Sequence, residues 1–214
     1  MNATFLPGLD VLAAYTLAAC VLIITPGPDM TLFLGQTLAG GRARGFASMF
    51  GVSAGLVLHS LLAAFGLSAL LAASATAFGV LKIAGIAYLL WLAFQALRHG
   101  SAFSLSPDAG SPTLTRAFLT GLGVNLLNPK IIVFFLTFLP QFVSVSDPHA
   151  GAKLMFLGLY FIALGVPICA LLIVLAERFT AALRRSPKAM RAVDYLFGGL
   201  MGAFAVRLLF ARAD

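Results

Sequence analysis

The sequence predicts an all-α fold, a polytopic membrane protein of six transmembrane helices that form two inverted three-helix repeats. Hydrophobic residues make up 61% of the 214 residues, charged residues make up 10%, and the mean hydropathy is +1.02. So few charges do not cover a water-soluble surface. Apolar stretches of about 20 residues, the length of a membrane span, recur along the chain. Prolines interrupt two of these stretches at matching positions in the two halves.

The six predicted helices are apolar stretches long enough, or nearly long enough, to cross a bilayer as helices. They cover approximately residues 11–34, 46–71, 78–97, 117–139, 154–176 and 193–210. They lack the alternation of apolar and polar positions that β-barrel strands show, and a buried soluble helix bundle is the less favoured alternative. No Lys or Arg precedes the first apolar run, so we expect the first helix to remain in the mature protein rather than to act as a cleaved signal peptide.

A polar segment divides the predicted helices into two groups of three. Residues 99–115 are rich in Ser, Pro, Gly and Asp, as flexible linkers are. We therefore predict a single membrane domain over 1–214, with one repeat over about 10–98 and a second over about 116–211. Because each repeat has an odd number of spans, related repeats must insert with opposite orientations, as in many secondary transporters.

The formal net charge of +7 indicates membrane topology rather than affinity for nucleic acid. Lys and Arg fall mainly in alternate loops, which the positive-inside rule assigns to the cytoplasm. The basic residues of that side are Arg42, Arg44, Arg98, Arg116, Arg178, Arg184, Arg185, Lys188 and Arg191. Lys153 and Arg212 belong to the other side, and the assignment of Lys82 and Arg207 is open. Both termini are then expected to face outward.

The first predicted helix contains a helix-breaking motif, Thr25-Pro26-Gly27-Pro28-Asp29. Neither proline donates a backbone hydrogen bond, so we expect a break or kink that frees carbonyl groups, and Thr25 either caps the break or satisfies such a carbonyl. Pro28 suits the first position of a restarted helix, with Asp29 in its first turn. Two interpretations of Asp29 remain open: the helix dipole simply favours a carboxylate there, or the carboxylate binds a proton or a substrate ammonium within the membrane.

The fourth predicted helix contains the matching motif Asn128-Pro129-Lys130. Asn is a strong N-cap and Pro fits the next position, so a helix is expected to restart at Pro129. The positive end of its dipole, together with Lys130, favours an anion such as a carboxylate. The alternative is that Lys130 reaches an interface along its aliphatic stem. Asn125, about one turn before Asn128, either faces the same cavity or bonds to another helix.

Small residues recur every four positions in the second predicted helix, at Ala47, Gly51 and Gly55, and His59 continues this face. The face predicts close helix packing, within the chain by preference and across a homodimer as the alternative. His59 is the only ionisable residue in the heart of that helix. A packed, hydrogen-bonded histidine is the favoured interpretation and a proton relay the alternative.

The two breaks together place an acid and a base in the membrane, and a zwitterionic amino acid carries the complementary charges. The predicted substrate-binding and coupling residues are Asp29, Lys130, Asn125, Asn128, Thr25 and His59, with structural helix breaks at Pro26, Gly27, Pro28 and Pro129. No P-loop, dinucleotide fingerprint or HExxH motif occurs, so we expect neither an enzyme nor a cofactor. Three scattered His and two separated Cys argue against a metal site.

These motifs resemble the lysine exporter (LysE) superfamily, and within it the homoserine/threonine resistance (RhtB) branch. The resemblance rests on residues 25–29, on the glycine run with His59 and on residues 125–130, and it covers essentially the whole chain. It implies a multi-pass protein of the bacterial inner membrane that exports amino acids or their derivatives, driven by the proton gradient. The alternatives are a metal-cation exporter of the same fold and a passive channel, which needs a continuous polar lining.

Overall fold

The computed structural model describes residues 7–67, 113–144 and 147–178, together with isolated positions between 80 and 98 and between 186 and 206. Every regular element in the three continuous ranges is a helix, which agrees with the predicted all-α class. The predicted third and sixth helices and most of the predicted linker lie outside these ranges. The six-helix count and the inverted repeat therefore stay predictions.

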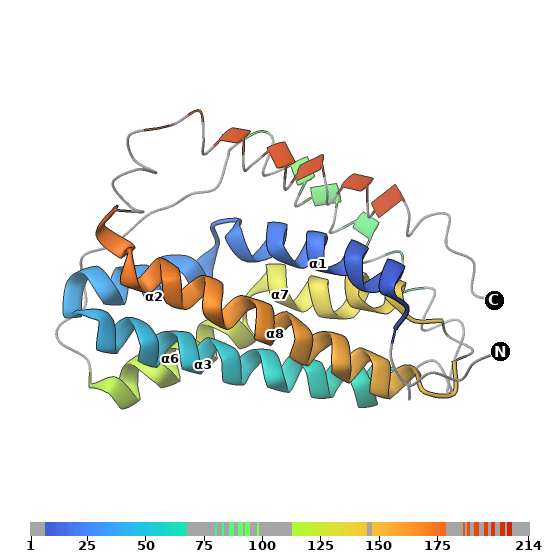
Figure 1. Ribbon diagram of the computed structural model, residues 1–214, viewed down its shortest axis with the longest axis horizontal. Coiled ribbons are helices and arrows are strands. Elements are labelled where there is room, and N and C mark those ends of the chain that lie inside the picture. The colour runs from blue at the N-terminus through green and yellow to red at the C-terminus, as the bar shows by residue number, and fades with distance from the viewer. Residues whose placement is uncertain are drawn as a thin grey trace.

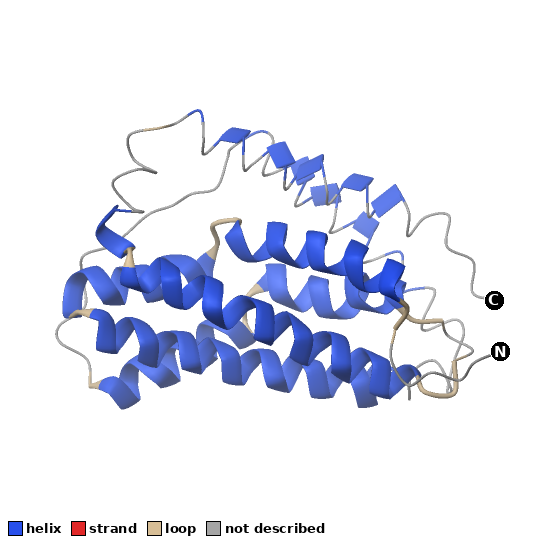
Figure 2. Ribbon diagram, viewed as in Figure 1, coloured by secondary structure: helices blue, strands red, loops and turns tan. Residues whose placement is uncertain are grey.

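The described helices form an elongated bundle and run along its long axis (Figure 1). In chain order they are α1 (Leu9–Ile24), α2 (Pro28–Gly40), α3 (Arg42–Leu61) with a π-helical end (Leu62–Leu67), α6 (Leu114–Leu126), α7 (Pro129–Val133) with π-helical (Phe134–Phe138) and 3-10 (Leu139–Phe142) continuations, and α8 (Ala150–Val174). Figure 2 shows the short loops that join α1 to α2, α2 to α3 and α6 to α7.

Two described helices are long and apolar enough to cross a bilayer alone, Arg42–Gly66 and Ala150–Val174. Two bent pairs pass the same test when each pair is taken as one span: α1 meets α2 at 49°, and α6 meets the helix that begins at Pro129 at 51°. The first, second, fourth and fifth predicted stretches are thus helical as far as they are described, and the described helix ends lie a few residues from the approximate predicted bounds. Hydropathy marks only the apolar length, whereas α2 continues until Gly41, whose φ of +84° ends the helix.

Close packing between α3 and α6 joins the two predicted halves. A Cβ atom at Gly51 would lie 1.9 Å from the carbonyl oxygen of Phe118, and a Cβ atom at Gly121 would lie 2.2 Å from that of Ser48. Both neighbours are backbone atoms, so only glycine fits at these two positions. The small-residue face of α3 therefore packs within the chain, which was the preferred prediction.

The described basic residues of the predicted cytoplasmic side gather at one end of the bundle. Arg42 and Arg44 begin α3, Arg116 lies in the first turn of α6, and Arg178 follows α8; these segments meet at the left of Figure 1. Lys153 lies in the first turn of α8, at the opposite end. This is the separation of charge that the positive-inside rule predicts.

Two clusters of buried apolar side chains fill the bundle. The cluster toward the end that carries Lys153 is aromatic, with ring centroids 5.2 Å apart for Tyr15 and Phe142 and 4.7 Å apart for Phe134 and Phe161. The cluster toward the basic end consists of Met30, Phe33, Leu34, Met49, Ile173 and Ala176. We call them the aromatic cluster and the methionine cluster. Members of both line the candidate site.

Candidate functional site

The break between α1 and α2 lies where the sequence predicts it. α1 ends at Ile24 and α2 begins at Pro28, which places Asp29 in the first turn of α2. Gly27 precedes α2 and offers no side-chain cap. The positive end of the α2 dipole therefore has a carboxylate in its first turn, an arrangement that lowers the electrostatic free energy of that carboxylate.

The same break leaves carbonyl groups at the end of α1. Pro26 has no N–H, so the carbonyl of Leu22, four residues earlier, lacks its helical donor. The hydroxyl of Thr25 donates to the carbonyl of Val21 at 2.7 Å, and this carbonyl also accepts from the N–H of Thr25 at 3.1 Å. Thr25 thus bonds to a backbone carbonyl, one of the two roles predicted for it, but not to a carbonyl that the break leaves free. The carbonyl oxygens of Leu22 and Thr25 remain available to donors from elsewhere in the fold.

The break between α6 and α7 is closed by one of its own side chains. Asn128 is the N-cap of α7, and its Oδ1 accepts a hydrogen bond from the N–H of Lys130 at 3.0 Å. Pro129 is the first residue of α7. The helix therefore restarts at the predicted residue and in the predicted way.

Side chains from the second break reach the first. Asn125 Nδ2 donates to Asp29 Oδ2 at 2.8 Å. Lys130 Nζ donates to the carbonyl oxygen of Thr25 at 2.9 Å and to that of Leu22 at 3.3 Å. The Lys130 amine thus lies inside the bundle rather than at an interface, and the carbonyls of α1 already use two of its hydrogens.

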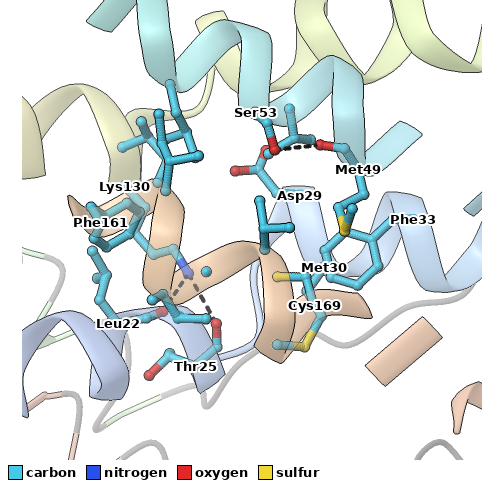
Figure 3. A pocket seen from close by; sticks show the side chains of 17 residues that line it. Leu22, Thr25, Asp29, Met30, Phe33, Met49, Ser53, Lys130, Phe161 and Cys169 are labelled. Atoms are coloured by element: carbon cyan, nitrogen blue, oxygen red, sulfur yellow. Dashed lines mark hydrogen bonds between the residues drawn. The ribbon is translucent and has the colours of Figure 1, made fainter. Parts of the chain in front are cut away.

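A cavity of about 60 Å³ lies beside these contacts (Figure 3). A water molecule needs at least about 10–15 Å³, so the cavity has room for a few. Its polar lining comes from Thr25, Asp29, Ser53 and Lys130, and the rest of the wall is apolar. Figure 3 shows the Lys130 amine directed at the carbonyls of Leu22 and Thr25 on one side of the cavity.

The acid and the base of this cavity are not joined by an ion pair. Within the described ranges an ion pair joins Asp147 to Lys153 and none joins Asp29 to Lys130. Nor do three or more His, Cys, Asp or Glu side chains come together in that part of the chain. Each charged group of the cavity is instead bound to a neutral partner from the other predicted half.

Several buried polar atoms of the site have no hydrogen-bond partner. Asp29 Oδ1 and Asn125 Oδ1 are unpaired acceptors, and Asn128 Nδ2 is an unpaired donor. Unpaired buried polar atoms are uncommon because each costs about 1–3 kcal/mol. Of these three residues only Asp29 lines the cavity, so its Oδ1 is the unpaired atom that a ligand in the cavity can reach, and Asn125 and Asn128 lie behind the lining.

His59 does not line the cavity; it packs against Asn125, which bonds to Asp29. Its ring stacks on Phe135 with centroids 5.6 Å apart, and its Nε2 lies 3.4 Å from the carbonyl oxygen of Asn125. A Cβ atom at Gly55, one turn earlier, would lie 2.4 Å from Asn125 Oδ1. Gly55 makes room for Asn125 and His59 packs against its backbone, which is the geometry of a packed histidine.

Sequence reasoning missed the contribution of α8 to the site. Phe161 and Cys169 of this helix line the cavity, and Figure 3 shows Phe161 beside Lys130. α8 is apolar on every face, so its sequence carries no periodic signal of which face turns inward. Ser53 of α3, whose hydroxyl donates to the carbonyl of Met49 at 2.9 Å, was missed as well.

Comparison with known proteins places both breaks in a described family. Residues 20–212 match the family model of the LysE type translocators. The chain is 34% identical over 199 residues to the homoserine/homoserine lactone efflux protein of Salmonella typhimurium, an alignment that covers 93% of this chain and 96% of that protein. It is 28% identical over 199 residues to the leucine efflux protein of Enterobacter sp. (strain 638), covering 91% and 92%.

A membrane protein of Vibrio cholerae with no characterised function is 28% identical over 205 residues, covering 96% of this chain and 99% of that protein. No solved structure matches the chain. The family match begins within α1 and includes the helix breaks, the glycine face of α3 and all of α8. The chain therefore belongs to the LysE type translocator family, whose members are transporters of the membrane.

Proposed function

We propose that this chain is a secondary transporter that exports amino acids or their derivatives across the bacterial inner membrane in exchange for protons. One observation carries the proposal: Asp29 and Lys130 line the same cavity without pairing with each other. A zwitterionic amino acid brings an ammonium for the first and a carboxylate for the second. The efflux names of the two relatives, for homoserine and its lactone and for leucine, support a cargo of this kind.

The unpaired atoms of the site match the two ends of such a substrate. The substrate ammonium would donate to Asp29 Oδ1, which lacks a partner and belongs to the cavity lining. The substrate carboxylate would accept from the third hydrogen of the Lys130 ammonium, since the other two are bound to carbonyls. Asn125 and Asn128 would act from behind the lining, Asn125 by holding Asp29 and Asn128 by capping α7. The substrate side chain would then face the apolar part of the wall.

Proton exchange follows from competition for one carboxylate. A substrate ammonium and a proton both neutralise Asp29, and a buried carboxylate without either carries a large desolvation cost. A proton that arrives from outside would displace the ammonium and release the substrate outward. The carrier would return with Asp29 protonated and lose the proton to the cytoplasm, so one binding group serves both directions.

The two apolar clusters are suited to act as gates on either side of the cavity. The methionine cluster lies toward the basic end, where a second cavity of about 570 Å³ is lined in part by Thr37, Arg42, Ile173 and Arg178. Ile173 belongs to the methionine cluster and also lines this second cavity, so the cluster lies between the two cavities. We propose that the methionine cluster opens for entry and the aromatic cluster for release, with the helix breaks as hinges.

The proposed repeats support the same mechanism. One repeat would extend over about 10–98 and the other over about 116–211, separated by the segment 99–115, with the substrate at their interface. The contacts of the site support this proposal because they connect a break in one proposed repeat to a break in the other. A homodimer remains part of the proposal, and it would use a surface other than the α3 face, which packs on α6 within the chain.

The proposal is tested by transport from proteoliposomes. Vesicles are loaded with labelled homoserine, leucine or lysine, a proton gradient is imposed, and release is followed for the wild type, Asp29→Asn, Lys130→Ala and the control Lys153→Ala. We expect saturable, gradient-dependent release by the wild type and the control, and loss of release in both site variants.

Other outcomes would identify an alternative function. Saturable release of a divalent metal cation, with no release of amino acids, would establish the metal exporter instead. Release that rises linearly with concentration and ignores the proton gradient would establish a channel. Amino-acid export that is equal in all four proteins would remove Asp29 and Lys130 from the mechanism.

A further inference from the structure

The end of α1 has the chemical features of a cation site. Pro26 leaves the carbonyl of Leu22 without a helical donor, and the carbonyl of Thr25 projects from extended backbone next to it. Both lie at the negative end of the α1 dipole, which carries roughly half an elementary charge. α1 has no basic residue of its own in its last turn.

The Lys130 amine occupies this site. It donates to the Thr25 carbonyl at 2.9 Å and to the Leu22 carbonyl at 3.3 Å, across 105 and 108 positions of the chain. In secondary transporters, unwound carbonyls and helix C-terminal ends of this type coordinate a free Na⁺ or a proton. Here a lysine side chain from the opposite break supplies the cation.

The space for the amine is made by Gly27. A Cβ atom at this position would lie 3.0 Å from Lys130 Nζ and 3.3 Å from Cε. The backbone of Gly27 is extended, with φ −168°, which any residue can adopt, so the feature that favours glycine here is the close approach of the lysine rather than the chain conformation. The backbone of the break is therefore in close contact with the Lys130 amine, both at Gly27 and at the two carbonyls.

We propose that the break at the end of α1 is a binding site for a small monovalent cation and that Lys130 is its permanently tethered occupant. The inference deepens the proposed function, because it gives the transporter a built-in cation where a free coupling ion would otherwise bind. It adds a second role to Lys130: the side chain joins the two breaks while its third hydrogen faces the substrate cavity. Transport then requires no Na⁺.

The consequence is that removal of the side chain uncovers a site for a free cation. Lys130→Ala removes the amine and the three carbons next to it and leaves a space of that shape. n-Propylammonium matches this space and carries the same charge and the same three N–H hydrogens as the lysine ammonium. Tetramethylammonium has the charge but no hydrogens to donate. Lys130→Met removes the charge but fills the space with a side chain of similar length. Lys153, which pairs with Asp147 at the opposite end of the bundle, provides the control Lys153→Ala.

The experiment measures the melting temperature of purified protein in lipid nanodiscs while each cation is titrated at constant ionic strength. We expect n-propylammonium to raise the melting temperature of Lys130→Ala with the logarithm of its concentration once the concentration exceeds its Kd, by about 2–4 °C at a few times the Kd. The wild type, Lys130→Met and Lys153→Ala should not respond, and tetramethylammonium should have no effect on any of them. A response of the same form by Lys130→Ala to Na⁺ would extend the site to metal cations.

Two results would overturn the inference. One is a Lys130→Ala protein that melts like the wild type and ignores every cation. The other is a response of the wild type equal to that of Lys130→Ala. If Lys130→Ala does not fold in any buffer, Lys130→Arg and Lys130→Met decide: a folded Arg variant beside an unfolded Met variant supports a cation site, and equal behaviour of the two contradicts it.

These measurements do not depend on transport, so the cation site and the export function can fail separately. If the cation response is found but no amino acid is exported, the site stands and the proposed cargo is wrong. Replacement of Na⁺ by choline in the transport assay completes the test: unchanged export agrees with the tethered cation, and a Na⁺-dependent export rate contradicts it.

Discussion

The two helix breaks have nearly the same bend, 49° between α1 and α2 and 51° between α6 and α7, but they differ in how their backbone groups are satisfied. The second break is capped locally, because Asn128 accepts from the N–H of Lys130 at 3.0 Å. The first break has no side-chain cap at Gly27, and two of its carbonyls are satisfied only by Lys130.

Because of this difference, the hydrogen-bond donors of the site come from one break and the acceptors from the other. Asn125 and Lys130, from α6 and α7, are the donors, and Asp29, Leu22 and Thr25, from the first bent pair, are the acceptors. The second break is capped by its own side chain, so it holds Asn125 and Lys130 in position to satisfy the unpaired groups of the first break. Similar bends therefore do not mean similar roles, and the uncapped break is the one whose bonds can be exchanged with a substrate or a proton.

The largest expected effect is on the contact that brings the two breaks together. In Gly51→Leu the side chain would collide with the backbone carbonyl of Phe118, which lies 1.9 Å from the position of a Cβ atom. Overpacking costs about 1–3 kcal/mol even against movable side chains, so we expect this variant to lose its folded, monodisperse form in size-exclusion chromatography.

Gly123→Leu is the matched control for that variant. It makes the same change in α6, at a position where a Cβ atom would meet nothing within 4 Å. It should elute and melt like the wild type. Equal behaviour of Gly51→Leu and Gly123→Leu would mean that α3 and α6 are not in the close contact that brings the two breaks together.

The second effect concerns the hydrogen bond from Asn125 to Asp29. Asn125→Leu keeps the volume of the side chain but removes the donor 2.8 Å from Asp29 Oδ2. A hydrogen bond to a charged group is worth about 1.5–3 kcal/mol, which corresponds to a loss of roughly 10- to 150-fold in transport rate at low substrate concentration. Initial rates from proteoliposomes measure it. Thr120→Ala, an exposed hydroxyl on the same helix, should transport normally, and a normal rate in Asn125→Leu would contradict the prediction.

The third effect tests the local cap of the second break. Asn128→Ala removes the capping oxygen of α7, and loss of an N-cap costs about 1 kcal/mol. For a protein of this size we expect the melting temperature to fall by about 2–4 °C. Asn128→Ser retains a capping oxygen and should recover most of the loss. If Ala and Ser melt alike, the second break is not stabilised by its own cap.

The smallest effect lies outside the membrane-spanning helices, at Asp147. The side chain of Lys153 and the N–H of His149 hydrogen-bond to this carboxylate and hold its pKa below the ordinary value. The bonds therefore add stability above about pH 4, the ordinary pKa, and this contribution is lost as pH falls through the lowered value. Because the pair is near the surface, we expect less than about 1 kcal/mol.

Melting temperatures of the wild type and Asp147→Asn between pH 7 and pH 3 measure this contribution. The two curves should differ slightly at pH 7 and converge on the acid side. A difference that grows on acidification would contradict the assignment. In contrast to the buried contacts between the breaks, this half-buried pair is expected to contribute little, because water reaches both partners.

The sequence by itself determined the helical membrane fold and the positions of both breaks. Prolines at 26, 28 and 129 lack an N–H, and Asn128 prefers the N-cap, so α1 ends before Pro26, and α2 and α7 begin at Pro28 and Pro129. These are properties of a residue and its near neighbours, and no distant contact is needed to read them. The ends of the helices were less well predicted because hydropathy does not record where a helix stops.

Only the tertiary structure decided which groups meet. The sequence identified Lys130 as an isolated charge in a span, but not that its amine would bind the carbonyls of Leu22 and Thr25. It carried no sign that Phe161 and Cys169 of α8 would form part of the cavity wall. The physical reason is that helices apolar on every face have no preferred orientation from composition. Their orientation is set by long-range packing; in α8, for example, Gly158 lies so close to Ser60 of α3 that a Cβ atom there would come within 2.3 Å of the Ser60 hydroxyl.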